Sequence, residues 1–305
     1  VTAFLDACWP AVTPEGLVFA LLSGAPAPGA GESLLDAAAA GVLDEAERAL
    51  LRWAKPARTA RATRWTAADA VLVDEAAGLI ERPASFGHVV IDEAQDLSPM
   101  QCRAIGRRVE HGSVTLLGDL AQGTAPWAAT EWATPLAHLG KPGTAVVPLT
   151  TGFRVPGAVV ALANRLLPAL RVDVPEARSL RSDGWLRVER VPDLDAAVVD
   201  AVRAALAEEG SVGVIAADAQ VPTIANRLAA AGIATGDADA DARVTVLPAT
   251  LAKGLEYDHV IVAEPARIVA AEERGLNRLY VVLTRAVSRL AVLHTEPLPA
   301  ALLAA

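Results

Sequence analysis

Acidic and amide side chains follow two short apolar segments of the sequence. Asp92 and Glu93 come directly after HVVI, and Asp119 and Gln122 follow SVTLLG. At the carboxyl end of a buried strand, one carboxylate can hold Mg²⁺ through water while a second orients or deprotonates an attacking water. A solvated acidic turn is the simpler interpretation of an isolated Asp-Glu pair.

Three later segments carry basic residues in comparable places. The sequence Phe153-Arg154-Val155-Pro156 comes after VVPLT, KGLEYD begins at Lys253 before HVIV, and LYVVLTRA contains Arg285 before the last apolar segment. Arginine side chains can stabilise the charge on a transferring phosphoryl group. Each segment alone is weak evidence, but the five segments in this order and spacing form a specific pattern.

Helices and strands are expected to alternate around these segments. Short, continuously apolar strands are predicted at 88–92, 113–119, 146–150, 185–191, 211–217, 243–247, 259–263 and 289–295. Helices are predicted at 67–81, 99–109, 156–170, 195–209, 221–231 and 272–286. This alternation predicts an α/β fold with parallel sheets and helices on both faces. A helical segment precedes it, including a helix over 34–53 that Ser33 caps.

The motifs resemble those of the UvrD/Rep-like superfamily 1 helicases. VVIDEAQD resembles the Walker B motif, LLGDLAQ the sensor motif, LTTGFRVP the arginine motif, ATLAKGLEYDHVIV the "KGLE" motif and RLYVVLTRA the last motif. FLDACWPAVTPEGLVFALL, HVVIDEAQDLSPMQCRAIGRR and GDLAQGTAPW resemble the HelD-type branch, whose members associate with RNA polymerase. The resemblance implies a RecA-like (P-loop NTPase) fold and an ATPase that uses ATP and Mg²⁺.

The same resemblance implies a role for each matching residue. Asp92 would organise Mg²⁺, Glu93 would position the attacking water, and Gln122 would sense the γ-phosphate. Arg154 and Arg285 would stabilise the transferring phosphoryl group. Four residues would bind the nucleotide, namely Asp92, Phe153, Gly254 and Glu256. Phe153 would stack on adenine, and Glu256 would approach the ribose or the triphosphate.

The phosphate-binding loop G-x-x-x-x-G-K-[ST] is absent from the sequence. We therefore expect the chain to correspond to a C-terminal fragment, with the loop in a missing N-terminal portion of the same protein. The expected division is a helical lead-in at 1–65, the C-terminal half of a first RecA-like domain at 66–149, and a second RecA-like domain at 150–305. The chain alone is expected to be inactive.

Composition and charge restrict the partners. The 305 residues are 53% hydrophobic, too apolar for a disordered chain, yet no apolar run is long enough to span a membrane. The net charge of −9 argues against a non-specific nucleic-acid binder and favours a protein partner, with nucleic acid secondary. The two cysteines lie far apart, as is typical of a cytoplasmic protein.

Two local features leave a nucleic-acid contact open. The segment Arg52–Arg64 holds five cations and no acid, and it is either a solvated linker or a contact for an anionic surface. Trp127 and Trp132 could stack on bases, although core or partner-facing positions are the simpler interpretation.

Three functions remain open from the sequence. The favoured one is a HelD-type factor that hydrolyses ATP and remodels or releases RNA polymerase core. The alternative is a UvrD-type single-stranded DNA translocase or repair helicase. The third is a binding module that keeps the motifs without turnover, which the intact Glu93, Gln122, Arg154 and Arg285 argue against.

Overall fold

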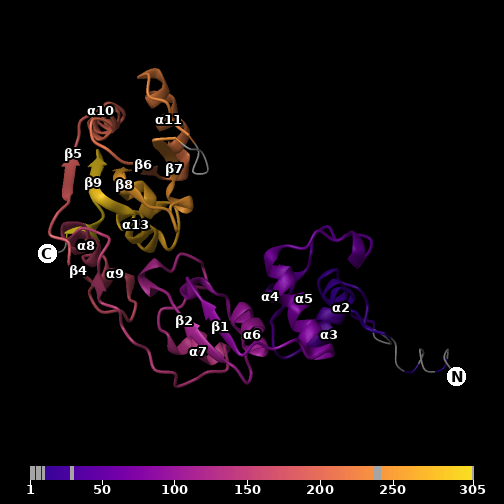
Figure 1. Ribbon diagram of the computed structural model, residues 1–305. Helices are drawn as coiled ribbons and strands as arrows, with labels where there is room; N and C mark the ends of the chain where they lie inside the picture. Colours follow the sequence, from indigo (N-terminus) through magenta and orange to yellow (C-terminus); the bar gives the residue numbers. More distant parts are fainter. Residues whose placement is uncertain (1–3, 5–7, 9–10, 28–30, 237–241, 304–305) are drawn as a thin grey trace. The chain divides into compact units, whose positions relative to one another are not determined.

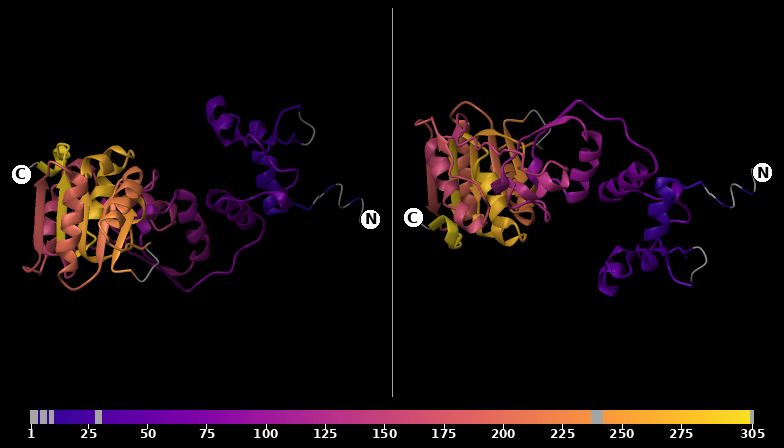
Figure 2. Two further views of the ribbon diagram at one scale, coloured as in Figure 1. Left: turned by 90° about the horizontal axis from the view of Figure 1, so that it is seen from above. Right: turned by 90° about the horizontal axis from the view of Figure 1, so that it is seen from below.

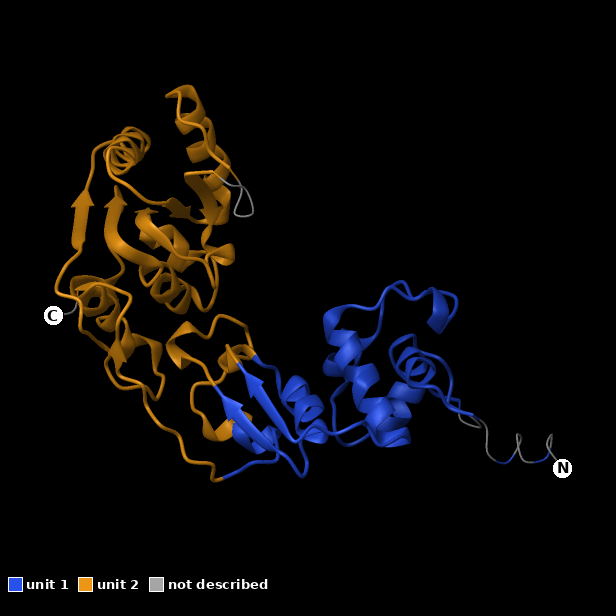
Figure 3. Ribbon diagram, in the orientation of Figure 1, with its two compact units in different colours: residues 1–91, 97–116, 136–142 blue, residues 92–96, 117–135, 143–305 orange. Residues whose placement is uncertain are grey.

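The computed structural model describes residues 4, 8, 11–27, 31–236 and 242–303 as an alternation of helices and strands (Figure 1). The chain forms two compact units (Figure 3). Unit 1 contains residues 1–91, 97–116 and 136–142, and unit 2 contains residues 92–96, 117–135 and 143–305. Within the described part of the chain, no helix has the length and apolar character needed to cross a bilayer.

The first described part of unit 1 consists of helices, and four of the five begin at a side-chain cap. They are α2 (Pro14–Leu22), α3 (Leu34–Ala39), α4 (Glu45–Leu51), η1 (Ala60–Ala62) and α5 (Ala67–Ile80). Val18 and Leu22 of α2 pack with Ala76 of α5 beneath Trp53 and Trp65, whose rings lie 5.9 Å apart. The N-terminal sequence that resembles the HelD-type branch lies partly outside the described residues.

The single helix predicted over 34–53 is wrong, because the chain forms two helices there. Ala40 is already extended at the end of α3. The Asp44 side chain then accepts a hydrogen bond from the Glu47 amide at 2.8 Å, and the Glu47 side chain accepts one from the Asp44 amide at 2.8 Å. This capping box starts a new helix at Glu45.

The rest of unit 1 contains a parallel strand pair, the helix that connects its strands, and residues 136–142. Strands β1 (His88–Ile91) and β2 (Ser113–Leu116) pair with His88 opposite Ser113, and α6 (Pro99–Arg108) connects them. Asp74 and Glu75 of α5 form ion pairs with three arginines of α6, namely Arg103, Arg107 and Arg108. The prediction of a buried strand at 113–119 is wrong in its burial, because alternate residues of β2 are exposed.

Unit 2 is built around a five-stranded sheet in which every pair is parallel. The strand order is β5-β9-β8-β6-β7. The strands are β5 (Trp185–Arg190), β6 (Val212–Ala216), β7 (Val244–Pro248), β8 (Tyr257–Ala263) and β9 (Ala286–His294). The short pair β3 (Thr151–Gly152) and β4 (Arg178–Ser179) is separate from this sheet.

Helices cover both faces of this sheet, as the apolar strands predict. In β6, Ile215 enters one hydrophobic cluster while Val214 and Ala216 enter the other. Helices α10 (Leu194–Leu206) and α11 (Val221–Ala230) lie on one face, and α8 (Gly157–Asn164) and α13 (Gly275–Leu283) lie on the other (Figure 1). The views of Figure 2 show the strands side by side with helices packed along them. The predicted α/β class with a parallel sheet and helices on both faces is confirmed.

The other elements are short. They are η2 (Ala94–Asp96), η3 (Leu120–Gln122), α7 (Ala133–His138), α9 (Leu167–Leu170), η4 (Asp218–Gln220), η5 (Ala249–Leu251), α12 (Pro265–Ala270) and α14 (Ala300–Leu303).

Two further predictions in this region are wrong, and proline explains both. The segment 146–150 is not a strand, and Val147 and Leu149 are 74% and 84% exposed. Pro148 has no amide hydrogen to donate to a neighbouring strand. The helix predicted over 156–170 divides into α8 and α9, because Pro168 cannot continue a helix from the preceding turn.

Candidate functional site

Five segments of unit 2 meet in one cluster of polar side chains. We call Glu93, Asp96, Gln122, Lys253 and Arg285 the polar network. They lie in the turn after β1, in η2, in η3, in the loop after η5 and at the end of α13. Buried charged and amide groups must be paired, so the contacts of each residue show what holds the network together.

The turn after β1 is held in an unusual backbone conformation. Glu93 has a φ of 53°, and its amide donates a hydrogen bond to the Asp92 carboxylate at 2.8 Å. The fully buried Gln95 side chain donates to Glu93 Oε2 at 2.6 Å and accepts from the Asp119 amide at 3.0 Å. Gln95 therefore ties the turn after β1 to the loop after β2. A non-glycine residue in the left-handed region is often associated with a functional site.

Lys253 joins three parts of the network through one ammonium group. Its Nζ lies 3.0 Å from Glu93 Oε2, forms an ion pair with Asp96, and donates to the Gln122 carbonyl at 3.2 Å. The Lys253 side chain is only 18% exposed. The opposite Asp96 oxygen accepts from the Thr124 and Ala125 amides, both at 2.9 Å. Asp96 therefore organises the loop after η3 as well as pairing with Lys253.

Gln122 is oriented at both ends of its amide. Its Nε2 donates to Asp119 Oδ2 at 2.9 Å, and its Oε1 accepts from Arg285 Nη2 at 3.0 Å. The second Asp119 oxygen accepts from the Ala121 amide at 2.9 Å. These bonds fix which atom of the Gln122 amide faces Arg285.

Arg285 is buried, with 4% of its surface exposed. Its Nε donates to the Val281 carbonyl at 3.0 Å and its Nη1 to the Leu255 carbonyl at 3.4 Å. Burial lowers the pKa of Arg285, and Arg154 acts in the same direction, while Glu256, Glu93 and Asp119 oppose the shift. The guanidinium is therefore a preorganised cation whose charge is balanced by nearby carboxylates.

The other sequence-predicted site residues lie at the exposed margin. Arg154 forms an ion pair with Glu256, and both side chains are nearly half exposed. Phe153 is 72% exposed and Asp92 is exposed as well. Gly254 adopts a φ of 79°. The structure thus joins Glu93, Gln122 and Arg285 directly or through Lys253, and Asp92 is bonded to the Glu93 amide. Phe153 and Gly254 have no bond to these residues among the hydrogen bonds and ion pairs of the described residues.

The start of α13 supplies donors that sequence reasoning missed. Arg274 donates to the carbonyls of Gly123 at 3.3 Å and Ala128 at 2.5 Å, and Asn277 donates to that of Ala121 at 3.0 Å. An asparagine within the apolar pattern of a helix was the available signal for Asn277. Gln95, Asp96 and Lys253 were also missed as site residues, although they stand inside the motifs VVIDEAQD and KGLE.

Asp92 is the residue that could hold a magnesium ion. Mg²⁺ keeps several waters and commonly takes one or two carboxylates together with phosphate oxygens. The exposed Asp92 carboxylate, oriented by the Glu93 amide, fits such a ligand. No group of three or more metal-binding side chains occurs in the part of the chain that the structure describes. The donor set therefore fits an ion shared with a phosphate rather than a cage of protein ligands.

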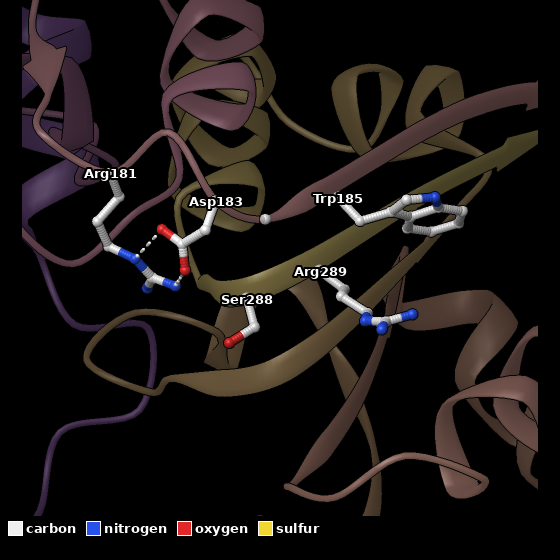
Figure 4. Close-up of a pocket in the computed structure, with 6 residues that line it drawn as sticks. Arg181, Asp183, Trp185, Ser288 and Arg289 are labelled. Carbon is white, nitrogen blue, oxygen red and sulfur yellow. Dashed lines mark hydrogen bonds and ion pairs between the residues drawn. The ribbon is translucent and has the colours of Figure 1, made fainter.

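A separate open pocket lies beside the first residues of β5 and β9. It has a volume of about 270 Å³ and is lined by Arg181, Asp183, Gly184, Trp185, Ser288 and Arg289. Arg181 and Asp183 face each other at its rim (Figure 4). None of the residues of the polar network lines this pocket.

No protein-family model matches the sequence, and no curated protein matches it. Among solved structures, the C-terminal domain of a possible DNA helicase from Lactobacillus plantarum WCFS1 is similar at 22% identity, with a TM-score of 0.38 over 50% of this chain and 93% of that one. The arterivirus nonstructural protein 10 helicase, in a complex with DNA, is 19% identical with a TM-score of 0.39 over 69% of this chain. The helicase of PRRSV is 14% identical with a TM-score of 0.38 over 68%. This chain spans 40% and 34% of those two viral chains.

Proposed function

We propose that the polar network and its margin form part of an ATP-hydrolysing site of a helicase-like protein. The observation that carries the proposal is the buried Arg285 guanidinium, hydrogen-bonded to Gln122 Oε1 at 3.0 Å within the same unit as Glu93. Preorganised cations beside a carboxylate are what phosphoryl transfer requires, because catalysis there is mostly positioning and charge stabilisation.

The proposed roles follow the resemblance of the motifs. Glu93 orients and deprotonates the attacking water, Gln122 contacts the γ-phosphate, and Arg154 and Arg285 stabilise the charge on the transferring group. Mg²⁺, when bound at Asp92, supplies charge neutralisation at the phosphate oxygens. Phe153 stacks on adenine, Glu256 approaches the ribose or the triphosphate, and Gly254 lies among the nucleotide-binding residues.

Contacts in the structure support a site that rearranges when nucleotide binds. Glu93 is paired with Lys253, and Arg154 with Glu256. A polyphosphate would compete with these carboxylates for the two cations, since phosphate oxygens are strong acceptors for Lys and Arg. Because the sequence lacks a glycine-rich phosphate loop, we propose that this chain supplies one side of the site and that the loop comes from elsewhere in the native protein.

Steady-state ATP hydrolysis by the native protein that carries this sequence tests the proposal. Arg154→Ala and Arg285→Ala are each expected to lower kcat by about 10³-fold or more, the range measured for arginine fingers. Arg187→Ala is the matched control, because Arg187 pairs with Glu189 on β5 away from the network. An unchanged kcat in both finger variants would exclude the assigned roles.

We further propose RNA polymerase core as the main partner, with nucleic acid secondary. The support is the HelD-like sequence segments and the net charge of −9. Capture of the native protein from lysate is expected to recover polymerase core subunits. Recovery of DNA-repair proteins without polymerase would favour the alternative, a UvrD-type DNA translocase.

A further inference from the structure

All three nitrogens of the Arg181 guanidinium take part in a total of four hydrogen bonds. Its Nε and Nη2 donate to the two oxygens of Asp183 at 3.0 and 2.6 Å. Its Nη1 donates to the carbonyl of Arg154 at 2.7 Å and to that of Val287 at 2.6 Å. The Asp183 carboxylate thus sets the orientation of the group (Figure 4), and the remaining nitrogen joins two distant parts of the backbone.

Those two backbone positions flank the proposed arginine fingers. One carbonyl belongs to Arg154 itself, and the other belongs to Val287, two residues after Arg285. A single nitrogen therefore connects the loop before α8 to the second residue of β9, across 133 positions of sequence between Arg154 and Val287. A shift of Arg181 would change the separation of these two segments.

The neighbours of Arg181 hold the same loop at several other points. Ser179 Oγ donates to the Val155 carbonyl at 2.6 Å, and the Gly157 amide donates to the Arg181 carbonyl at 2.9 Å. Gly184 has a φ of 111°, and a Cβ there would lie 2.5 Å from the Pro156 ring. Residues 179–184 therefore form a cradle around the backbone of residues 154–157.

We infer that Arg181, oriented by Asp183, is a positioning residue that sets the spacing between the backbone segments carrying Arg154 and Arg285. The inference rests on the proposed function of those two arginines. Arg181 itself touches no reacting atom in this account. Its effect on hydrolysis comes through the placement of two other guanidinium groups, for which a displacement of about 1 Å can cost roughly 100-fold in rate.

The first test requires no enzymatic activity. Amide hydrogen exchange in the 305-residue chain is compared between wild type, Arg181→Ala and the control Arg187→Ala. The Leu180 amide donates to the Gly152 carbonyl at 3.0 Å. Arg181→Ala is expected to speed exchange roughly tenfold at this amide and at that of Gly157, because local opening costs less free energy once the link is lost, and to leave exchange in the strand β6 unchanged. Exchange at the wild-type rate at both amides in Arg181→Ala would overturn the inference.

The second test measures ATP hydrolysis by the native protein. Arg181→Ala is expected to lower kcat by about 10–100-fold with little change in KM, because positioning of the fingers matters in the transition state. Arg181→Lys should fail to restore kcat, since one ammonium cannot replace a guanidinium that bonds a carboxylate and two carbonyls. Recovery of kcat in Arg181→Lys, or equal losses in kcat and in affinity for ATP in Arg181→Ala, would contradict a positioning role.

A double variant separates this inference from the proposed function. The kcat of Arg154→Ala/Arg181→Ala is expected to fall less than the product of the two single losses, because the loss of Arg154 already removes one of the two guanidinium groups that Arg181 positions. If Arg154→Ala lowers kcat and Arg181→Ala does not, the positioning role is wrong. If neither Arg154→Ala nor Arg285→Ala lowers kcat, the proposed function fails, and hydrogen exchange still decides whether Arg181 links the two segments.

Discussion

Replacing Lys253 by methionine tests whether the ammonium group holds the polar network together. Methionine keeps most of the aliphatic length and removes the contacts to Glu93, Asp96 and the Gln122 carbonyl. A hydrogen bond to a charged group contributes about 1.5–3 kcal/mol when it is protected from water. The Asp96 pair is the protected one, because its two side chains are only 18% and 25% exposed.

The contribution of the second ion pair is smaller. The Glu93 side chain is about half exposed, so its pair with Lys253 adds roughly 0–1 kcal/mol. Asp96 also keeps its two backbone donors after the change. We therefore expect Lys253→Met to lower the free energy of unfolding by about 2–3 kcal/mol.

Urea denaturation followed by circular dichroism measures this loss. Lys55→Met is the matched control, because Lys55 is an exposed lysine in unit 1 and its replacement should change the free energy of unfolding by less than about 0.5 kcal/mol. Lys253→Met should also loosen the loop after η3, seen as faster amide exchange at Thr124 and Ala125. Equal stabilities of the two variants would refute the assignment of Lys253 as the link within the network.

Three further predictions concern the rest of the chain. Ile215→Ala in the fully buried centre of β6 should lower the free energy of unfolding by about 2–5 kcal/mol, as measured by urea denaturation. A loss below about 1 kcal/mol would contradict a sheet that is buried on both faces. Burial raises the pKa of the Cys102 thiol to about 11. At pH 8 a thiol reagent should therefore label Cys102 only after unfolding, and rapid labelling of Cys102 in the folded chain would contradict its burial. The hydrogen bond from Arg108 lowers the pKa of Asp74 in the folded chain. The stabilisation that the ionised Asp74 contributes is therefore present above the unfolded pKa near 3.8 and is lost as the pH falls through the lower folded pKa. Asp74→Asn should remove that part of the acid dependence of unfolding, and an unchanged acid-unfolding curve would count against the ion pair.

The sequence predicts the sheet of unit 2 well because its strands are continuously apolar. Strands β6, β8 and β9 are buried on both faces, so their composition identifies them without knowledge of their neighbours. The wrong predictions occur where a single residue decides whether a strand forms or where a helix begins or ends. Pro148 prevents a strand in an apolar segment, Pro168 divides a helix, and the Asp44 cap begins a helix that periodicity alone merges with the preceding one.

The candidate site is predictable in its motifs but not in its pairings. The motifs name Glu93, Gln122 and Arg285, and their chemical roles stay predictions. The bond between Arg285 and Gln122 joins residues 163 positions apart, and that of Arg181 to Val287 joins residues 106 apart. Periodicity and spacing describe only local structure, so contacts of this range come from the fold. The HelD-type branch and the division at residues 65 and 149 likewise stay predictions.

Turnover by the Glu93→Gln variant tests the central claim most directly. Glutamine keeps the shape of the side chain and the contact with Gln95 but cannot accept a proton from water. The native protein is expected to hydrolyse ATP with Mg²⁺, and Glu93→Gln should lower kcat by about 100-fold or more while ATP still binds. Magnesium-dependent hydrolysis at the wild-type rate in the Glu93→Gln protein would contradict the account.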